Sequence, residues 1–421
     1  MQRWRICEED KISRLPDEIL SHILSFLTTK KAVRTSLLSK RWTDLWQSCH
    51  IIDFTDIQVY CNRTNRRFNK LVESVLATAG SRNINTFLLE ILYGHPHFAY
   101  KVSFRNVVKW VNKIVLQNEL KNLCLHLDVD EYDDEDNNED EHFLPKLPNC
   151  IFTCKTLVSL DLRRFRVKGF SFSSDGFGFP SLKTLHLDDI KFPRGRDFLL
   201  LLSGCPILED LKLFQVYLEC WFNESVILKE FESLSLPKLI RTYIIESLCD
   251  ILPLKALATS KSLCLDTLQH HLAFKAQAQT QVPSDDIPIF YNLTHLKLHN
   301  SWDLVVRVLH HCPKLQNIEL FEDMYGARGN GDDNEESCEE LEFVPQCLLS
   351  HLRSCTIQNL GRLERDLILP MYILKNARVL QTMKIKIWYR SEQSEIERKF
   401  SLCSKASASC QLLFYASFVN V

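Results

Sequence analysis

The hydrophobic positions of this chain repeat in a short, regular pattern over much of its length. Residues with the spacing L-x-x-L-x-L, in which one copy has an isoleucine, begin at Leu120, Leu157, Leu182, Leu208, Leu293 and Leu315. The last two apolar residues of each copy alternate with other residues, as in a strand with one buried face, and the first anchors the turn before that strand. Stacked copies would bury one continuous apolar column, so the pattern predicts an array of repeats.

This spacing is the signature of a leucine-rich-repeat solenoid. The copies at Leu157, Leu182 and Leu208 start 25 and 26 residues apart and those at Leu293 and Leu315 start 22 apart, which lies within the range known for such repeats. The 85-residue interval between Leu208 and Leu293 should hold about three degraded repeats, with residues 233–239 and 257–265 as visible remnants.

Weaker signals extend the array on both sides. Residues 84–92 predict a strand and residues 103–117 an amphipathic helix, so we expect the solenoid to start near residue 80. At the other end the spacing returns in weakened form at residues 352–357 and 380–385, on either side of a predicted helix at 372–378.

Residues 15–46 predict three short helices. Pro16 suits a first helical turn, where its missing N–H is not needed, and the two acidic residues after it complement the positive end of the helix dipole. Thr28 or Thr29 can cap a second helix, and Ser39 a third. Because a unit below about 40 residues usually needs outside help to stay folded, this segment predicts a partner surface.

This stretch strongly resembles the F-box, whose Leu-Pro, acidic residue, spaced aliphatic residues and closing Ser-Lys-Arg-Trp are present almost throughout. The resemblance implies docking onto a Skp-type adaptor, which in turn binds a cullin. The residues that it places in or beneath the adaptor-facing surface are Leu15, Pro16, Ile19, Leu20, Ile23, Leu24, Val33, Leu37, Leu38 and Trp42. The alternative is that they form the core of a helical cap on the solenoid, and periodicity alone does not separate core from contact residues.

Residues 343–414 resemble the FBD, a plant domain found behind F-box and leucine-rich repeats, in the stretches VPQCLLSHL, YILKNARVLQTMKI and SLCSKASASCQLLF. They depart from it at residues 354–358, where that family commonly has a Trp and Gly-rich stretch. The expected fold is therefore α/β, with an all-helical F-box at 8–56, a helical linker at 57–82, a leucine-rich-repeat solenoid at 83–340 and a C-terminal FBD cap at 341–416.

Composition and charge limit the classes of partner and the cell compartment that we expect. The 421 residues are 45% hydrophobic, which is enough for a large core, and the net charge of -2 makes no global electrostatic case for nucleic acid or anionic membranes. The N-terminus has charges where a signal peptide needs an apolar stretch, and the apolar runs are too short to span a bilayer. We therefore expect a protein of the cytoplasm or nucleus, which counts against an extracellular repeat receptor.

The 16 cysteines are expected to be free thiols packed as small hydrophobic residues in a reducing compartment. Cys150 and Cys154 are the closest pair for a metal, but no second pair accompanies them, so no metal or other cofactor is expected. Cys205 and Cys312 each precede a proline at the start of a repeat, where the proline ends a helix and the cysteine should be a buried spacer.

Other candidate chemistry is weak. Acidic runs at 128–141 and 332–340 predict solvated loops or, as the minority interpretation, recruitment of a basic partner; neither has the glycine and flanking helices of an EF-hand. The pairs His270-His271 and His310-His311 lack nearby ligand sets, and the sequence contains no nucleophile elbow or phosphate-binding loop motif.

These features predict a scaffold and not an enzyme. The resemblance implies a substrate-recognition subunit of an SCF-type E3 ubiquitin ligase, in which the F-box binds the adaptor and the repeats hold a target protein near the catalytic subunits. The alternative is a repeat scaffold, or an adaptor-binding protein that does not direct ubiquitylation. The target and any assisting small molecule stay unidentified, because a repeat surface is read by shape and scattered side chains.

Overall fold

The computed structural model divides the chain into two compact units, Met1–Thr184 and Leu185–Val421. The residues that it describes are 11–12, 14–79, 83–94, 104–117, 119–129, 144–169, 178–220, 233–245, 252–265, 287–299, 302–321, 343–360, 364–387 and 393–416. Both units combine helices with parallel strands that follow one another in chain order, which confirms the predicted α/β class and the repeat array.

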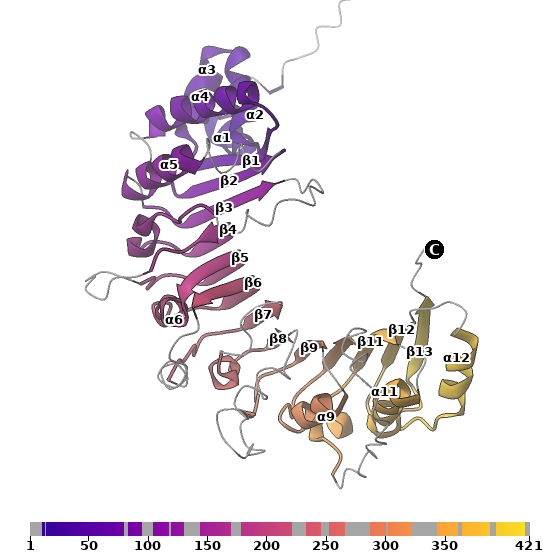
Figure 1. Ribbon diagram of the computed structural model, residues 1–421. Coiled ribbons are helices and arrows are strands. Elements are labelled where there is room, and N and C mark those ends of the chain that lie inside the picture. Colours follow the sequence, from indigo (N-terminus) through magenta and orange to yellow (C-terminus); the bar gives the residue numbers. More distant parts are fainter. Residues whose placement is uncertain are drawn as a thin grey trace, which may run out of the picture. The chain divides into compact units, whose positions relative to one another are not determined.

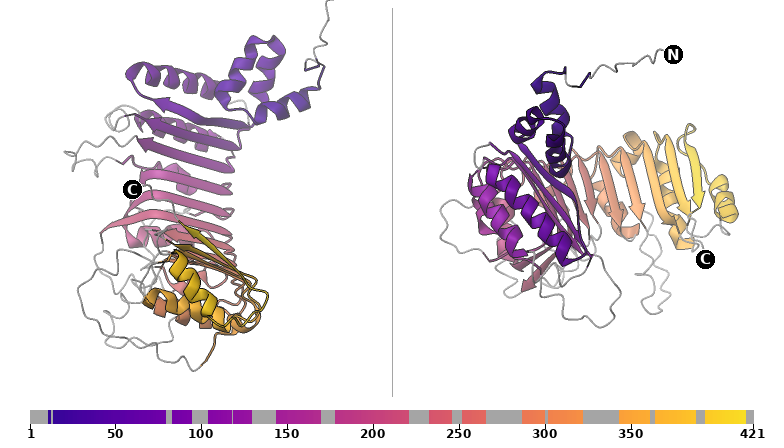
Figure 2. Two further views of the ribbon diagram at one scale, coloured as in Figure 1. Left: turned by 90° about the vertical axis from the view of Figure 1, so that its right-hand side faces the viewer. Right: turned by 90° about the horizontal axis from the view of Figure 1, so that it is seen from above.

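The first unit begins with short helices and continues into a parallel sheet (Figure 1). Its elements are α1 (Asp17–Ser25), α2 (Thr29–Arg34), the 3-10 helix η1 (Thr35–Leu37), α3 (Lys40–Ser48), β1 (Ile51–Val59), α4 (Asn62–Ala79), β2 (Thr86–Tyr93), α5 (Phe104–Gln117), β3 (Asn122–Val129), η4 (Asn149–Thr153) and β4 (Ser159–Arg166). Strands β1 to β4 pair in chain order and in parallel. Figure 2 shows α4 and α5 side by side over one face of these strands.

The second unit continues the alternation of strands and helical segments. Its elements are β5 (Thr184–Arg194), α6 (Gly195–Ser203), β6 (Asp210–Cys220), β7 (Arg241–Ile245), η5 (Leu254–Leu257), β8 (Ser262–Leu265), β9 (His295–His299), α9 (Trp302–His310), β10 (Asn317–Phe321), α10 (Gln346–Ser350), β11 (Ser354–Leu360), α11 (Glu364–Asn376), β12 (Thr382–Ile387), α12 (Gln393–Leu402) and β13 (Gln411–Ala416). Strands β6 to β13 pair in parallel without a crossover.

The residues of the repeat pattern form the core, as predicted. Leu123 of β3 lies opposite Leu160 of β4 in register, and both side chains are buried. The first leucine of a copy closes a tight turn: the Leu208 N–H donates to the carbonyl oxygen of Cys205 at 3.3 Å. Since burial of one leucine stabilises a fold by about 1.5 to 3 kcal/mol, the stacked column is a large contribution to stability.

Two strands, β7 and β8, are present among the described residues of the interval in which about three degraded repeats were expected. β6 pairs with β7, β7 with β8 and β8 with β9, so these described strands are direct neighbours in the sheet. Thr242 and Ser260 occupy two positions of the pattern that are leucine elsewhere. Their buried hydroxyls lie 2.9 Å apart and hydrogen-bond to each other, which removes most of the cost of placing them in an apolar column.

The sheet begins one strand earlier than the sequence predicts. β1 pairs with β2 from Ile51↔Thr86 onward, and its Ile52 and Phe54 side chains are fully buried. Residues 57–59, which were assigned to a helical linker, belong to this strand, and the helix of that linker is α4. The stretch was missed because β1 lacks the leucine pattern and its register shifts after Phe54.

A bend recurs directly after the repeat pattern in β4, β5, β6 and β11. The residue two positions after the last core residue of the pattern has a left-handed backbone, with φ of 64°, 49°, 49° and 59° at Arg164, Asp189, Gln215 and Asn359. The next side chain then turns into the core, as Phe165, Ile190, Val216 and Leu360 do. Each of these strands therefore buries at least one apolar residue more than the six-residue pattern shows.

The structure also bears on the predictions for the cysteines, the histidine pair, the acidic runs and a membrane span. Cys205 and Cys312 are fully buried just after α6 and α9, as expected. His270, His271 and the acidic runs beyond Val129 lie outside the described residues. Within the part of the chain that the structure describes, the helices are too short or too polar to cross a bilayer.

Candidate functional site

The helices α1, α2 and α3 form a small bundle with its own core. α1 packs against α3, with Leu20 and Leu24 of α1 buried. Trp42, Leu45 and Trp46 of α3 are buried too, which confirms their predicted position on one helical face. Because these side chains fix how each helix is turned, they also decide which residues face outward.

Arg41 explains why the segment needs its Leu-Pro-Asp start and its Lys-Arg-Trp end together. The Arg41 guanidinium in α3 donates from Nη2 to the carbonyl oxygen of Leu15 at 2.6 Å and from Nε to Asp17 Oδ1 at 2.7 Å. The two contacts join the start of α1 to α3 across 24 to 26 residues of chain. Since the Asp17 side chain is well exposed and that of Arg41 partly exposed, we assign this pair a positioning effect more than a large stability effect.

Thr29 attaches the helical bundle to the sheet. Its hydroxyl oxygen is buried and accepts a hydrogen bond from the N–H of Asp53 in β1 at 2.8 Å. Thr28 and Ser39 occupy the predicted cap positions of α2 and α3, but neither side chain makes the capping hydrogen bond, so that part of the prediction was wrong. In this segment it is therefore the Thr29 hydroxyl, bonded to β1, that stabilises the structure.

Replacing Thr29 by valine should destabilise the first unit, because the Asp53 N–H loses its acceptor. We expect the free energy of unfolding to fall by about 1 to 3 kcal/mol, measured by urea denaturation of the full chain. Thr29→Ser keeps the hydroxyl and should retain most of the stability. An equal loss in both variants would show that the hydrogen bond contributes little.

Several large apolar side chains are exposed on this bundle, and together we call them the apolar face. It comprises residues of α1, η1 and the segments that directly adjoin them: Pro16, Ile19, Ile23, Phe26, Leu37 and Leu38. The exposed fraction is 90% for Leu37, 76% for Phe26 and 68% for Leu38, and Ile19 and Ile23 are nearly half exposed. Single exposed apolar residues are common, but this density within one short bundle is typical of an interaction surface.

The structure divides the predicted adaptor-binding residues into exposed, half-buried and buried ones. Of the predicted surface residues, Pro16, Ile19, Ile23, Leu37 and Leu38 are exposed, whereas Leu15 and Val33 are half-buried. Leu20, Leu24 and Trp42 are buried and can only support the surface from beneath.

Phe26 is a surface residue that the resemblance to the F-box did not include. It follows Ile23 by three positions and Ile19 by seven, so helical spacing could have placed it on the same face. Its ring meets the His22 ring edge to face, with centroids 4.8 Å apart. This contact holds the aromatic side chain at the end of α1 while leaving most of it exposed.

The cysteine pair considered for a metal makes other contacts. The Cys150 thiol donates to Asn112 Oδ1 at 2.9 Å, and the Cys154 sulfur lies 3.4 Å from Thr156 Oγ1. Burial raises the pKa of the Cys150 thiol to about 11, and burial raises that of Cys205 to about 12. Thiols with such pKa values are protonated at neutral pH and are poor nucleophiles.

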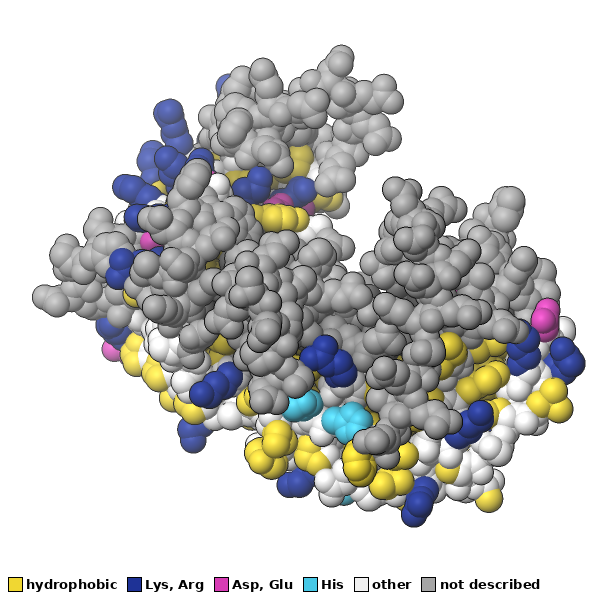
Figure 3. Space-filling view, turned by 60° about the horizontal axis from the view of Figure 1, so that its bottom comes forward, with side chains coloured by type: hydrophobic (Ala, Val, Ile, Leu, Met, Phe, Trp, Pro, Cys, Tyr) yellow, Lys and Arg dark blue, Asp and Glu magenta, His cyan; other side chains and the backbone are white. Residues whose placement is uncertain are grey.

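The exposed face of the second unit's sheet carries cations beside aromatic rings. The Lys212 Nζ lies 5.6 Å from the centre of the Tyr243 ring, and the Lys297 Nζ lies 4.4 Å from the centre of the Phe321 ring. On the side of the molecule that Figure 3 draws, which is turned from that of Figure 1, hydrophobic side chains also lie in small groups between Lys, Arg and His side chains. Mixed apolar and cationic surfaces of this kind suit a protein partner without identifying it.

Three family models match successive parts of the chain. The F-box domain matches residues 12–54, the leucine-rich repeats of FBD-associated F-box protein At5g56370 match residues 107–229, and the FBD matches residues 339–385.

Relatives from Arabidopsis thaliana match most of the chain. FBD-associated F-box protein At4g10400 is 29% identical over 96% of this chain and 100% of its own length, and F-box/FBD/LRR-repeat protein At4g00160 is 27% identical over 96% and 94%. F-box/LRR-repeat protein At4g14103 is 37% identical over 55% of this chain and 54% of its own length.

Proposed function

Because the chain belongs to the plant family of proteins that join an F-box, leucine-rich repeats and an FBD, we propose that it is the substrate-recognition subunit of an SCF-type E3 ubiquitin ligase. In this proposal the F-box binds a Skp-type adaptor, and through it a cullin, in the cytoplasm or nucleus. The chain itself is not catalytic. It holds a target protein close to the subunits that transfer ubiquitin.

The apolar face of the F-box is the observation that supports adaptor docking best. Leu37 and Phe26 contribute little burial to the fold of this chain, since most of each side chain stays in water. A partner that covered them would gain about 1.5 to 3 kcal/mol for each large side chain buried. A helical cap on the solenoid, the alternative interpretation of this segment, needs an inward apolar face but has no need of an outward one.

Target binding is assigned to the exposed face of the repeat sheet. Along each strand the residues between the buried ones point to that face, so neighbouring repeats present a continuous surface. Tethering a target there raises the effective concentration of its lysines near the ubiquitin-loaded enzyme, and proximity is the whole contribution that this chain makes.

Co-purification from plant cells tests the adaptor step. The tagged full chain should bring down a Skp-type adaptor and a cullin, and the double variant Ile19→Asp, Ile23→Asp should lose both. Leu116→Asp is the matched control, because Leu116 on α5 is also an exposed leucine, at 73%, but lies outside the apolar face. If the intact chain brings down no adaptor, the proposal fails.

Reconstitution tests whether ubiquitylation follows adaptor binding. The complex of this chain, adaptor and cullin should place ubiquitin on proteins that the chain captures, and the Ile19→Asp, Ile23→Asp variant should capture them without modifying them. Stable adaptor binding with no transfer to captured proteins would support the alternative of an adaptor-binding protein that does not direct ubiquitylation.

A further inference from the structure

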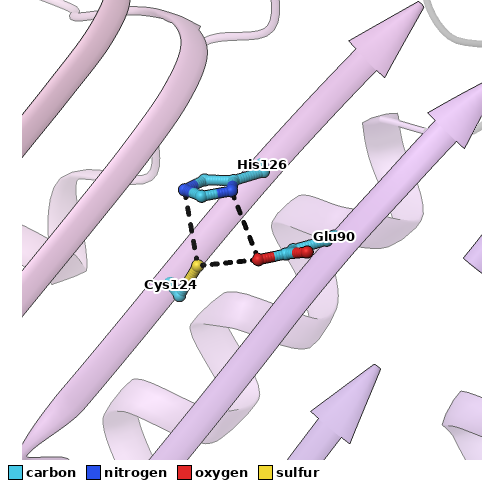
Figure 4. A group of neighbouring side chains, drawn as sticks. All are labelled: Glu90, Cys124 and His126. Carbon is cyan, nitrogen blue, oxygen red and sulfur yellow. Dashed lines mark hydrogen bonds and ion pairs between the residues drawn. The ribbon is translucent and has the colours of Figure 1, made fainter. Parts of the chain in front are cut away.

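Three potential metal ligands converge on the exposed face of the first unit's sheet. Glu90 of β2 pairs in register with His126 of β3, and Cys124 lies two residues before His126 on the same face of that strand (Figure 4). One ligand atom from each of the three residues lies within 4.8 Å of the others. The opposite face of β3 is the leucine core, so the cluster is not part of the repeat packing.

Asp161 of β4 fixes the orientation of the histidine ring. Its Oδ1 lies 2.8 Å from His126 Nε2, a distance at which Nε2–H donates to the carboxylate. The neutral ring then has its lone pair on Nδ1, and Nδ1 lies 3.4 Å from Glu90 Oε1. Two acceptors that face each other repel unless a proton or a metal ion lies between them.

The distances are close to those that a bound metal ion requires. An N–H···O hydrogen bond is normally 2.7 to 3.2 Å long, and the Nδ1 to Oε1 distance of 3.4 Å exceeds that range. A tetrahedral zinc ion with ordinary bond lengths separates nitrogen from oxygen by about 3.4 Å and sulfur from oxygen by about 3.6 Å. The Cys124 Sγ lies 3.9 Å from the same Glu90 oxygen and 3.5 Å from His126 Nε2, so a side-chain rotation that brings Sγ to the Nδ1 side of the ring would complete the three-ligand set.

We propose that Glu90, Cys124 and His126 bind a divalent metal ion of the zinc class through Oε1, Sγ and Nδ1. A set of one sulfur, one nitrogen and one oxygen suits zinc better than calcium or magnesium, which prefer oxygen ligands alone. Asp161 acts on the metal indirectly by holding the Nε2–H of His126, as carboxylates commonly do behind metal-bound histidines. Binding releases the thiol proton to solvent, and the fourth position is open to water or to an outside ligand.

The full chain should be titrated with Co²⁺ as the probe, because a cobalt–thiolate bond has its own charge-transfer absorption. We expect one site with that absorption, and Zn²⁺ should displace the cobalt. Cys124→Ser should abolish the absorption, whereas Cys150→Ser should keep it, because Cys150 is a half-buried thiol bonded to Asn112 outside the cluster.

A second variant separates metal binding from a structural role. Asp161→Asn should weaken Co²⁺ binding by about 10- to 100-fold while thermal unfolding of the metal-free chain changes little. The proposal is wrong if the intact chain gives no cobalt–thiolate absorption, or if Cys124→Ser binds Co²⁺ with the same absorption as the intact chain. A cluster held by hydrogen bonds alone would give the first of these results.

Discussion

Replacing Leu37 and Leu38 together by alanine should weaken binding of a Skp-type adaptor by about 100-fold or more. Both side chains lie largely in water in the free chain, at 90% and 68% exposure, so their truncation removes contacts only in the complex. Two leucines at about 1.5 kcal/mol each amount to roughly 3 kcal/mol, and each 1.4 kcal/mol is a factor of ten in Kd. Isothermal titration of the full chain with purified adaptor measures the change.

The stability of the same double variant is its internal control. Because surface substitutions away from caps and buried networks usually change stability by less than about 0.5 kcal/mol, its urea midpoint should match that of the intact chain. Leu116→Ala, on the exposed side of α5, should leave adaptor affinity unchanged. An unchanged Kd in the double variant would place the adaptor contact elsewhere.

Trp42→Ala should unfold the helical bundle and abolish adaptor binding without touching the apolar face. Trp42 is only 8% exposed and shares the buried face of α3 with Leu45 and Trp46. Truncation of a buried tryptophan costs about 3 to 5 kcal/mol, which is a large part of what so small a bundle can have. Hydrogen exchange should show lost protection in α1 and α3, while the strands of the second unit stay protected.

A conservative substitution distinguishes packing from direct contact at Trp42. Trp42→Phe keeps an aromatic ring in the core and should retain most of the protection and of the adaptor affinity. Loss of binding in Trp42→Phe with full protection of α1 and α3 would mean that Trp42 contacts the adaptor itself, contrary to its burial.

The sequence predicted the repeats well wherever a leucine stands at each core position. It identified the repeats of β7 and β8 only as degraded remnants, because Thr242 and Ser260 stand where the pattern has leucines and the hydrogen bond between them is visible only in three dimensions. It also missed β1, since that strand buries Ile52 and Phe54 with no leucine pattern. Local spacing shows which residues are apolar, whereas a core formed across strands tolerates substitutions that spacing does not anticipate.

The sequence predicted which segment forms the candidate site, but only the structure shows which of its residues are exposed. Helical periodicity identifies Ile19 and Leu20 equally well, yet one faces water and the other the core. That difference depends on where α3 packs against α1, which is a tertiary contact. The metal-ligand cluster was beyond sequence reasoning for the same reason, because strand register places Glu90 beside His126 across 36 residues of chain.

Hydrogen exchange of the full chain, with and without bound adaptor, tests the docking surface most directly. The proposal predicts slower exchange in α1, η1 and the residue that follows each of them when the adaptor is present, with no change in the strands of the second unit. The Leu37→Ala, Leu38→Ala variant should show that protection only at much higher adaptor concentration. Protection confined to the exposed sheet face, with none in α1 or η1, would contradict the proposal that the F-box docks the adaptor.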